Sequence, residues 1–479
     1  MDGKMWIGGR WTTGDAAGWI AVENPATGAT VGRVAAGTVR DAETAVKAAR
    51  RAQPAWEKLP PATRAAFLRR LAALLDRDSE SLAALITAEQ GKPLAQARGE
   101  VGGAIGFIEF AADNARRIEG EIVPSDNPGE EIWIRRDAVG VVVGLTAWNF
   151  PVALAGRKLG PALAAGCTIV LKSHELTPLS LVRFAELCEE AGIPPGVVNV
   201  VSGSGREIGA ALVSAPETDL VTLTGSTRAG REIFAAAASG LKILRLEMGG
   251  KAPFLVMPDC DLDAAAEALV ASRMVNCGQV CTCPERVYVH RRVYDAFVEK
   301  VVARVSRLTV GDPKTDVDLG PKVSSDEAAK VTAMVDAAIL DGAEALNRPA
   351  PPDGPGHWSA PTVLTVPSND LAIMRDEIFG PVVPILSVDN YESALACAND
   401  TVYGLSAYLW TRDHARLMDF ARRSHFGELY LNRGAGEAFQ GFHTGRGQSS
   451  LGGEDGRHGL DAYSHKRTVY LGALEVAEC

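Results

Sequence analysis

The chain has 479 residues, 47% of them hydrophobic and 23% charged, which is typical of a soluble globular protein of roughly three domain-sized units. Its formal net charge of -10 argues against a nucleic-acid or anionic-membrane partner. The initial segment "MDGKMWIGGRW" has no apolar core of signal-peptide length, and the apolar run 139–148 is about half of a membrane span, so we expect a cytoplasmic protein.

Helical periodicity dominates the alanine-rich residues 41–118, for example in "RAAFLRRLAALLDRDSESLAALI". The next segment, "GEIVPSDNPGEEIWIRRD" (120–137), instead reads as strands. It separates the helical region from the most regular part of the chain, so we expect it to lie outside the main domains.

Residues 139–247 alternate apolar, β-rich runs with helical stretches. Pro151 suits the first turn of one helix, and Gly192 the end of another. Continuous apolar strands that alternate with helices predict a parallel sheet covered on both faces, whose ligands bind beyond the carboxyl ends of the strands. The expected strands are "VGVVVGLT", "CTIVLK", "VVNVV", "LVTLT" and "KILRLE", and the residues at their ends are Trp148, Asn149, Lys172, Ser202, Gly225, Ser226 and Glu247.

A second alternation begins at residue 252. It runs from the strand "APFLVM" through a helix opened by Asp261 and the strand "RVYVH" to the later strands "VVPILSV" and "ELYLN". We therefore expect a second α/β domain. The segment "KRTVYLGA" (466–473) lies beyond it and is predicted to be another strand outside both domains.

Three of the eight cysteines crowd into "NCGQVCTCPERV": Cys277, Cys281 and Cys283. A structural zinc site needs a second pair of ligands, and none is found, so we expect no metal. Cys281 and Cys283 are too close in the chain for an unstrained structural disulfide. Cys277 fits a buried core position. Gly278 is a helix breaker that can place Cys281 at an exposed turn, which suits a nucleophile better than a core thiol.

Two glycine-rich segments each follow a strand and open a helix. "GSGREIG" (203–209) is one residue too long for the usual dinucleotide fingerprint, and "GSTRAG" (225–230) lacks the Lys–Ser/Thr of a phosphate loop. Each signal is weak alone. Because a helix N-terminus favours a pyrophosphate, Gly205 and Gly225 are nevertheless candidate cofactor contacts.

Several motifs together resemble the aldehyde dehydrogenase superfamily, in its order and at its spacing, over nearly the whole chain. Three further stretches, "CTCPERVYV", "ALAGRKLGPAL" and "EAFQGFHTG…GGEDGRHGL", are similar to its lactaldehyde/glycolaldehyde dehydrogenase branch. The superfamily motifs are "AWNFP" (147–151), "LKSHE" (171–175), "LTGST" (223–227), "LEMGGKAP" (246–253), "GQVC" (278–281) and "EIFGPV" (377–382).

The resemblance implies an α/β fold in three parts. These are a Rossmann-like NAD-binding domain (1–119 and 138–248), an α/β catalytic domain (249–445) and a small β oligomerisation element (120–137 and 460–479). In relatives this element docks on a second protomer, so we expect a homodimer or homotetramer with Val469 and Leu471 at or near the contact. The expectation agrees with the marginal stability of an isolated hairpin in water.

The resemblance also implies the catalytic residues. Cys281 matches the nucleophile, whose thiolate adds to the aldehyde to give a thiohemiacetal; hydride transfer to the nicotinamide then leaves a thioester, which water hydrolyses. Asn149 matches the oxyanion donor, and Glu247 the general base that activates the water. Lys158 matches a lysine that the family keeps near the site. A free thiol has a pKa of about 8.5, so the site must supply positive potential or a base.

For the cofactor, Lys172 and Glu175 match the positions that contact the adenosine ribose. A carboxylate there accepts the ribose hydroxyls and repels a 2′-phosphate, which favours NAD over NADP. The remaining cofactor positions by resemblance are Ser226 at the pyrophosphate, Glu377 at the nicotinamide ribose, and Phe379 and Trp148 near the nicotinamide. The motif "KSHE" departs from the common "KPSE", which puts His174 beside this pocket.

Arg157, Glu437 and His443 match substrate-pocket positions of the lactaldehyde branch. Thr282 stands where that branch has Asn, and "NRGA" (432–435) stands where it has "NREN". We expect oxidation of a small polar, α-hydroxylated aldehyde. The alternatives are a sugar-derived aldehyde, including an anhydro-sugar, and a semialdehyde whose carboxylate is clamped by Arg157. From other classes, an inactive NAD-binding relative and a cysteine hydrolase fit the retained motifs less well.

Overall fold

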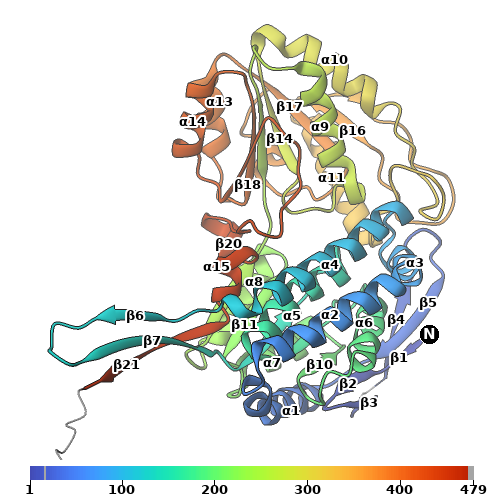
Figure 1. The fold of residues 1–479 in the computed structure, drawn as a ribbon. Helices are drawn as coiled ribbons and strands as arrows, with labels where there is room; N and C mark the ends of the chain where they lie inside the picture. The colour runs from blue at the N-terminus through green and yellow to red at the C-terminus, as the bar shows by residue number, and fades with distance from the viewer. Residues whose placement is uncertain (16–17, 473–479) are drawn as a thin grey trace, which may run out of the picture.

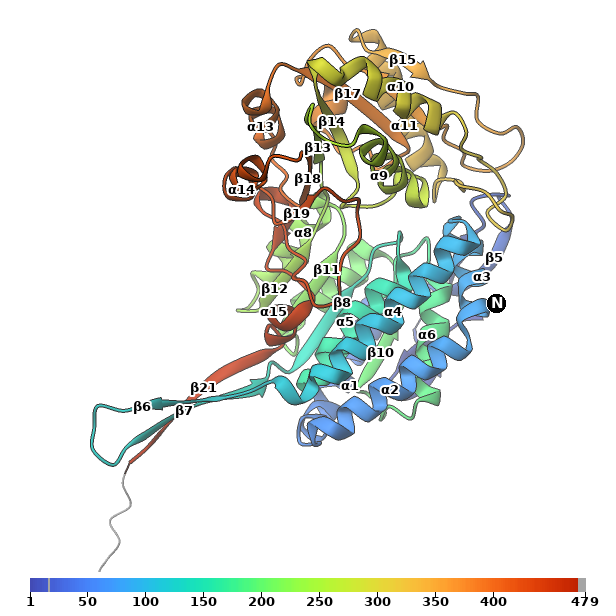
Figure 2. The same ribbon diagram turned by 45° about the horizontal axis from the view of Figure 1, so that its top comes forward.

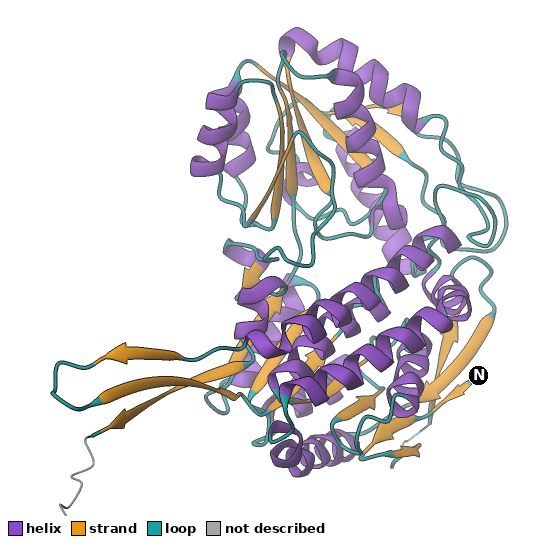
Figure 3. Ribbon diagram, viewed as in Figure 1, coloured by secondary structure: helices purple, strands orange, loops and turns teal. Residues whose placement is uncertain are grey.

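The computed structural model describes residues 1–15 and 18–472, which form two lobes and a projecting arm (Figures 1 and 2). Each lobe is built on one large sheet with helices on both faces (Figure 3). No helix of the described residues is long and apolar enough to span a membrane.

The sheet of the first lobe has eight strands. Its five central strands run parallel, and the outer strands pair antiparallel at both edges. In spatial order the strands are β20 (Ser450–Leu451), β12 (Ile243–Glu247), β11 (Leu220–Thr224), β8 (Val141–Leu145), β9 (Thr168–Lys172), β10 (Val198–Val201), β2 (Met5–Ile7) and β3 (Arg10–Thr12). The parallel sheet predicted for residues 139–247 is therefore confirmed.

Helices cover both faces of this sheet because alternate strand residues point to opposite sides. In β8, Val141 and Val143 join the core on one face, and Val142 joins the core on the other. The first face carries α1 (Val39–Glu57), α7 (Ala210–Ser214) and α8 (Thr227–Ala237). The second face carries α2 (Pro61–Arg77), α3 (Ser79–Gln90), α4 (Leu94–Asn114), α5 (Pro151–Ala165) and α6 (Leu179–Glu190).

The sheet of the second lobe has seven strands, all parallel except β15 at one edge. In spatial order they are β15 (Glu344–Asn347), β16 (Thr362–Thr365), β17 (Val382–Val388), β14 (Pro284–His290), β13 (Ala252–Val256), β18 (Ser406–Trp410) and β19 (Glu428–Leu431). One face packs on α9 (Leu262–Met274) and α10 (Tyr294–Val305). The other packs on α11 (Ser325–Leu340), α12 (Ala372–Arg375), α13 (Tyr391–Asn399) and α14 (His414–Arg423).

The arm is an antiparallel sheet of β6 (Glu121–Pro124), β7 (Glu131–Ala138) and β21 (Ser464–Leu471) that leaves the body of the molecule (Figure 1). The two strand segments predicted outside the domains thus pair with each other, although they are more than 300 residues apart. Residues 460–463 instead complete α15 (Gly456–Asp461) and the turn after it, where Leu460 and Tyr463 enter the core of the first lobe. Residues 473–479 of the predicted element lie outside the described residues.

Two local predictions were incomplete. The first 35 residues contain a small separate sheet of β1 (Asp2–Gly3), β5 (Thr30–Ala35) and β4 (Trp19–Glu23), whose short strands carry too little periodicity to be recognised. Between β10 and β11, where the alternation predicts one helical stretch, the chain begins with a π-helical turn, η2 (Gly205–Gly209), before α7.

Candidate active site

A cavity of about 580 Å³ lies where the strands of the first lobe end. Its wall includes residues after β8, β9, β10, β11 and β12, and it is closed from the second lobe by Cys281, Glu377 and Phe379. All eight predicted cofactor residues line it, together with Asn149 and Cys281. The cavity therefore collects one side of the predicted site in one place.

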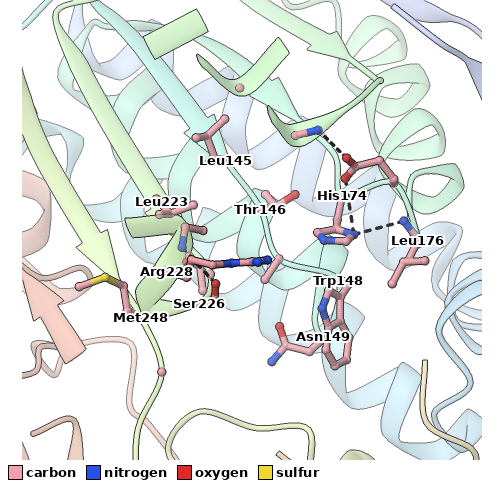
Figure 4. Close-up of a pocket in the computed structure, with 18 of the residues that line it drawn as sticks. Leu145, Thr146, Trp148, Asn149, His174, Leu176, Leu223, Ser226, Arg228 and Met248 are labelled. Carbon is pink, nitrogen blue, oxygen red and sulfur yellow. Dashed lines mark hydrogen bonds and ion pairs between the residues drawn. The ribbon is translucent and has the colours of Figure 1, made fainter. Parts of the chain in front are cut away.

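One wall of the cavity carries the side chains expected at the adenosine ribose. Lys172 ends β9; its Nζ donates to the carbonyl of Ser173 at 2.8 Å and lies 3.5 Å from Glu175 Oε2. The backbone N–H of Gly205 donates to Glu175 Oε1. His174 lies beside this carboxylate (Figure 4), and burial lowers the pKa of His174 to about 4, which favours the neutral ring. Glu175 is thus held at the cavity wall with one oxygen beside a cation.

The N-terminus of α8 opens into the same cavity. Ser226 caps the helix by accepting a hydrogen bond from the backbone N–H of Ala229 at 3.1 Å. Arg228 extends from the start of α8 toward the side of the cavity where Trp148 and His174 lie (Figure 4). A helix N-terminus and a guanidinium favour an anionic group, and the pyrophosphate expected at the segment 225–230 stays a prediction.

Glu377 and Phe379 close the cavity on the side of the second lobe. The backbone N–H of Gly250 donates to Glu377 Oε1 at 2.8 Å, and burial raises the pKa of Glu377 to about 7. Phe379 has a φ of +53° and packs edge-on against Trp148, with ring centroids 5.4 Å apart. Its backbone N–H donates to Glu285 Oε1 at 2.7 Å, which fixes this rarely adopted conformation.

Cys281 lies in the turn between η3 (Val275–Gly278) and β14, and it is the cysteine of the cluster that reaches the cavity. The preceding residues Asn276 and Cys277 are left-handed, with φ of +51° and +55°. Cys277 and Cys283 are buried in the core, as the sequence predicted for Cys277. The seven cysteines among residues 1–15 and 18–472 are all free thiols.

The surroundings of Cys281 do not favour its thiolate. Burial raises the pKa of the Cys281 thiol well above its usual value, and the nearby Glu437 raises it further, while Arg157 opposes both. Asn149, the predicted oxyanion donor, is buried at the cavity wall, and its Nδ2 donates to the carbonyl of Gln279 at 3.0 Å. Activation of the thiol therefore requires a base or a change of potential when ligands bind.

Glu247 ends β12 but does not line the cavity. Its Oε1 accepts a hydrogen bond from Ser450 Oγ at 2.7 Å, and its Oε2 lies 3.7 Å from His443 Nε2. Burial raises the pKa of Glu247 to about 7, against the opposing charge of His443. A carboxylate that titrates near neutral pH is suited to general-base work.

His443 lies between three carboxylates. Its Nδ1 is 3.0 Å from Glu428 Oε1 and 3.6 Å from Glu437 Oε1, and its Nε2 faces Glu247. Burial opposes the imidazolium, but Glu437 and Glu428 raise the pKa of His443 to about 10. Glu428, Glu437 and His443 have the separation of a cation-binding group. Since Arg157 already pairs with Glu437 and the ring is protonated, hydrogen bonding accounts for this arrangement.

Arg157, on α5, is buried, and its Nε and Nη2 are both paired with carboxylates. Its Nε lies 2.9 and 3.0 Å from the two carboxylate oxygens of Asp455, and its Nη2 lies 2.6 Å from Glu437 Oε2. Glu454 Oε2 is 3.7 Å from Nε. Lys158, the next residue, pairs with the other oxygen of the same carboxylate: its Nζ donates to Glu454 Oε1 at 2.6 Å.

The structure does not bring all predicted residues to one surface. Lys158 is 0% exposed and bonded to Thr222 and Thr224 on β11, and Thr282 is buried behind the cysteine, where its carbonyl accepts hydrogen bonds from Ser406 and Tyr408. Sequence reasoning missed Glu428, Glu454 and Asp455. The acidic pair between glycines in "GGEDG" was the available sequence signal for Glu454 and Asp455. No local pattern marked Glu428.

The chain matches the family model described as "Aldehyde dehydrogenase family" over residues 11–469. The chain belongs to the aldehyde dehydrogenase family. It is 43% identical over 473 residues to the 3,6-anhydro-alpha-L-galactose dehydrogenase of Vibrio sp. (strain EJY3), with 98% of each chain covered. It is 40% identical to the glutarate-semialdehyde dehydrogenase of Pseudomonas aeruginosa, again with 98% of each covered.

The crystal structure of lactaldehyde dehydrogenase from Escherichia coli is also similar, at 41% identity and a TM-score of 0.97, with 98% of this chain and 99% of that chain covered. The molecule therefore has the aldehyde dehydrogenase fold, and the protein is an oxidoreductase that acts on aldehydes. The relatives that it resembles act on different aldehydes, so family membership leaves the substrate open.

Proposed function

We propose that this aldehyde dehydrogenase oxidises a small, uncharged, hydroxylated aldehyde to its carboxylic acid with NAD as cofactor. The observation that carries the proposal is the pairing of Arg157. Its guanidinium is 8% exposed and bonded to Asp455 and Glu437. A semialdehyde that placed its carboxylate on Nε or Nη2 of Arg157 would have to displace one of these carboxylates.

The charges around Arg157 point the same way. Four carboxylates, those of Glu428, Glu437, Glu454 and Asp455, stand against the three cations Arg157, Lys158 and His443. No positive charge is left over to pair with an anionic substrate. Burying the substrate's charge without a partner would cost free energy. Carboxylate oxygens can instead accept hydrogen bonds from substrate hydroxyls.

The cavity fits a dinucleotide, because its wall combines a helix N-terminus, a carboxylate at each end and the aromatic pair Trp148 and Phe379. Bound NAD would supply the hydride acceptor. Glu175, half-buried beside Lys172, would accept the ribose hydroxyls, and its charge would repel a 2′-phosphate. Glu377 would accept the hydroxyls of the nicotinamide ribose.

The chain's own groups then have the following roles. The thiolate of Cys281 adds to the aldehyde carbon, and Asn149 Nδ2 donates to the oxygen that becomes negative. Glu247 accepts a proton from the water that attacks the thioester, which releases the acid and restores the thiol. The imidazolium of His443, 3.7 Å from Glu247, stabilises the carboxylate form that this step requires.

An aldehyde panel read by NADH absorbance tests the substrate. We expect kcat/KM for glycolaldehyde, lactaldehyde or glyceraldehyde to exceed that for succinate and glutarate semialdehydes by about tenfold or more, the cost of one unpaired buried charge being of that order or larger. The isosteric variant Asp455→Asn weakens the ion pair with Arg157. It should therefore raise kcat/KM for the semialdehydes relative to that for the hydroxyaldehydes. A wild-type preference for semialdehydes would refute the proposal.

A sugar-derived aldehyde is the second candidate, because the 3,6-anhydro-alpha-L-galactose dehydrogenase relative acts on an uncharged, hydroxylated compound to which the same charge argument applies. Gly434, which stands in place of a bulkier residue of the lactaldehyde branch, could have been expected to enlarge the pocket for a sugar, but the structure does not support this directly. A Cβ at this position would point at Ser272 Oγ, 2.9 Å away on α9, so the glycine relieves packing there. Including 3,6-anhydrogalactose in the panel separates the two candidates.

We also propose that the arm pairs with a second copy of the chain. Ile122 is 74% exposed and Tyr470 67% exposed, and Val469 and Leu471 lie on the same outer strand. An apolar strand edge of this kind is an aggregation hazard unless it is covered. Light scattering should show a dimer or tetramer, which is lost in a chain ending at residue 463, a variant that keeps the buried Tyr463 and lacks β21. A stable, active monomer of the full chain would refute this proposal.

A further inference from the structure

Lys92, Gln96 and Glu100 follow one another at intervals of four residues, from just before α4 along one face of it. None of them lines the cavity. Lys92 and Glu100 are buried and form an ion pair at 2.5 Å. A buried ion pair is costly to desolvate unless both charges have further partners, so their remaining contacts are informative.

The lysine holds the backbone of the predicted oxyanion donor. Lys92 Nζ donates to the carbonyl of Asn149 at 2.6 Å and lies 3.7 Å from the centroid of the Phe150 ring. Asn276 Nδ2 donates to the same carbonyl at 3.0 Å from the other lobe. Two donors therefore fix the peptide from which the Asn149 side chain projects.

The glutamate holds the start of α5, which begins two residues after Asn149. Glu100 Oε1 accepts hydrogen bonds from the backbone N–H groups of Val152 at 2.8 Å and Ala153 at 3.3 Å. The first N–H groups of a helix have no partner within it, and a negative charge there is stabilised by the helix dipole. Lys92 and Glu100 thus fix the Asn149 carbonyl and the first turn of α5 together.

Gln96 extends this row to the cysteine turn. Its Oε1 accepts a hydrogen bond from the backbone N–H of Asn276 at 2.7 Å. Asn276 in turn accepts from Gln279 Nε2 at 2.9 Å, and the carbonyl of Gln279 accepts from Asn149 Nδ2 at 3.0 Å. Lys92 therefore contacts Asn149, and Gln96 on α4 contacts η3, which leads into the turn that carries Cys281; α4 lies near the junction of the lobes (Figure 2).

We propose that Lys92, Gln96 and Glu100 are positioning residues that hold the Asn149 amide in register with Cys281 across the two lobes. The proposal rests on the role of Asn149 as oxyanion donor given above. Oxyanion donors act only when they are fixed to within about 0.5 Å before the reaction. The row acts through Asn149 and Asn276, without touching the aldehyde or the cofactor.

A double-mutant cycle tests the coupling. Lys92→Met is made in the wild-type and in the Asn149→Ala background, and kcat and the KM for NAD are measured. We expect kcat to fall about 10- to 100-fold in the wild-type background, because a misplacement of about 1 Å costs that much. In the Asn149→Ala background the further fall should be less than about twofold, and the KM for NAD should change little in both.

The outcomes separate two failures. If Lys92→Met lowers kcat by the same factor in both backgrounds, the effect is general and the positioning proposal is wrong. If Asn149→Ala alone keeps its full kcat, the oxyanion role in the proposed function is wrong, and the positioning proposal falls with it. Should Lys92→Met not fold, Gln96→Ala carries the same cycle, because this residue is only half-buried and loses two hydrogen bonds, the acceptor for Asn276 and the donor to the carbonyl of Asp318.

Glu89 provides a matched control for Glu100. It is also buried, and it accepts from the backbone N–H groups of Leu179 at 2.7 Å and Ser180 at 2.9 Å, at the start of α6 and away from Asn149. Glu100→Gln should lower kcat about tenfold or more, whereas Glu89→Gln should change Tm but not kcat. Equal losses of kcat in the two variants would contradict the proposal.

Discussion

The cofactor crevice and the aldehyde side of the site are built in different ways. The crevice is made where successive strands of one sheet end, so Trp148, Lys172 and Ser226 reach it from neighbouring βα connections. The proposed aldehyde side is made by ion pairs between distant segments, such as Arg157 with Asp455, which lie 298 residues apart.

This difference separates binding from selectivity. A crevice built from strand ends and a helix N-terminus tolerates the loss of a single side chain, because the sheet still positions the other residues of its wall. The aldehyde side depends on a balance of buried charges, where one neutral substitution leaves an opposite charge unpaired. Substitutions on the two sides should therefore have separable effects.

Cys281→Ala should produce the largest effect, a fall in kcat of about 10⁶-fold, because no other thiol of the cluster reaches the cavity. Binding of NAD, followed by quenching of tryptophan fluorescence, should persist, since the crevice is otherwise intact. Cys283→Ser is the control: Arg273 donates to Cys283 Sγ at 2.7 Å, and serine keeps an acceptor there. Inactivity of the control with activity of Cys281→Ala would reverse the assignment.

Glu247→Gln should lower kcat by about 10²- to 10⁴-fold and remove a pH dependence. The pKa of Glu247 is raised to about 7, and the base acts only as a carboxylate, so wild-type kcat should rise as the pH increases through about 7. The variant cannot titrate at this position, so its profile should be flat there. The test is to measure kcat with saturating substrates at pH values on both sides of 7. If the rise in kcat persists in the variant, a group other than Glu247 causes it.

Glu175→Gln should reduce the ratio of kcat/KM for NAD to that for NADP by about 10- to 100-fold, the value of one hydrogen bond to a charged group. The expected cause is loss of both the acceptor for the ribose hydroxyls and the repulsion of a 2′-phosphate. Glu327→Gln is a suitable comparison, because Glu327 is another carboxylate on the wall of the cavity. A wild-type preference for NADP would show that Arg228 or His174 outweighs Glu175.

Glu437→Gln should produce the smallest effect, an increase of up to about tenfold in the rate at which iodoacetamide alkylates Cys281 at neutral pH. The sign follows from the charge: Glu437 raises the pKa of the Cys281 thiol, so its removal increases the thiolate fraction. Glu428→Gln alters the same His443 cluster without removing a charge that acts on the thiol, so it should leave the rate nearly unchanged. Slower alkylation in Glu437→Gln would contradict this account.

Local pattern was enough to predict much of the first lobe. The strands β8 to β12 are continuous apolar runs. In the second lobe, Asp261 caps α9 as expected. Each of these signals acts within a few residues. The turn at Cys281 could be predicted because Gly278 is a helix breaker. The structure explains this glycine: its φ is +72°, and a side chain there would collide with the backbone of Gly380. The short strands at the N-terminus offered no comparable signal.

The sequence by itself determined the alternation of strands and helices and most of the strand ends that line the crevice, because period and turns are local properties. The nucleophilic role of Cys281, which the resemblance implies, stays a prediction. Only the tertiary structure decided that Arg157 pairs with Asp455 and Glu437, that His443 faces Glu247, and that Lys92 holds Asn149. These contacts join residues far apart in the chain, and the pairing of buried charges follows from packing, which no local pattern encodes.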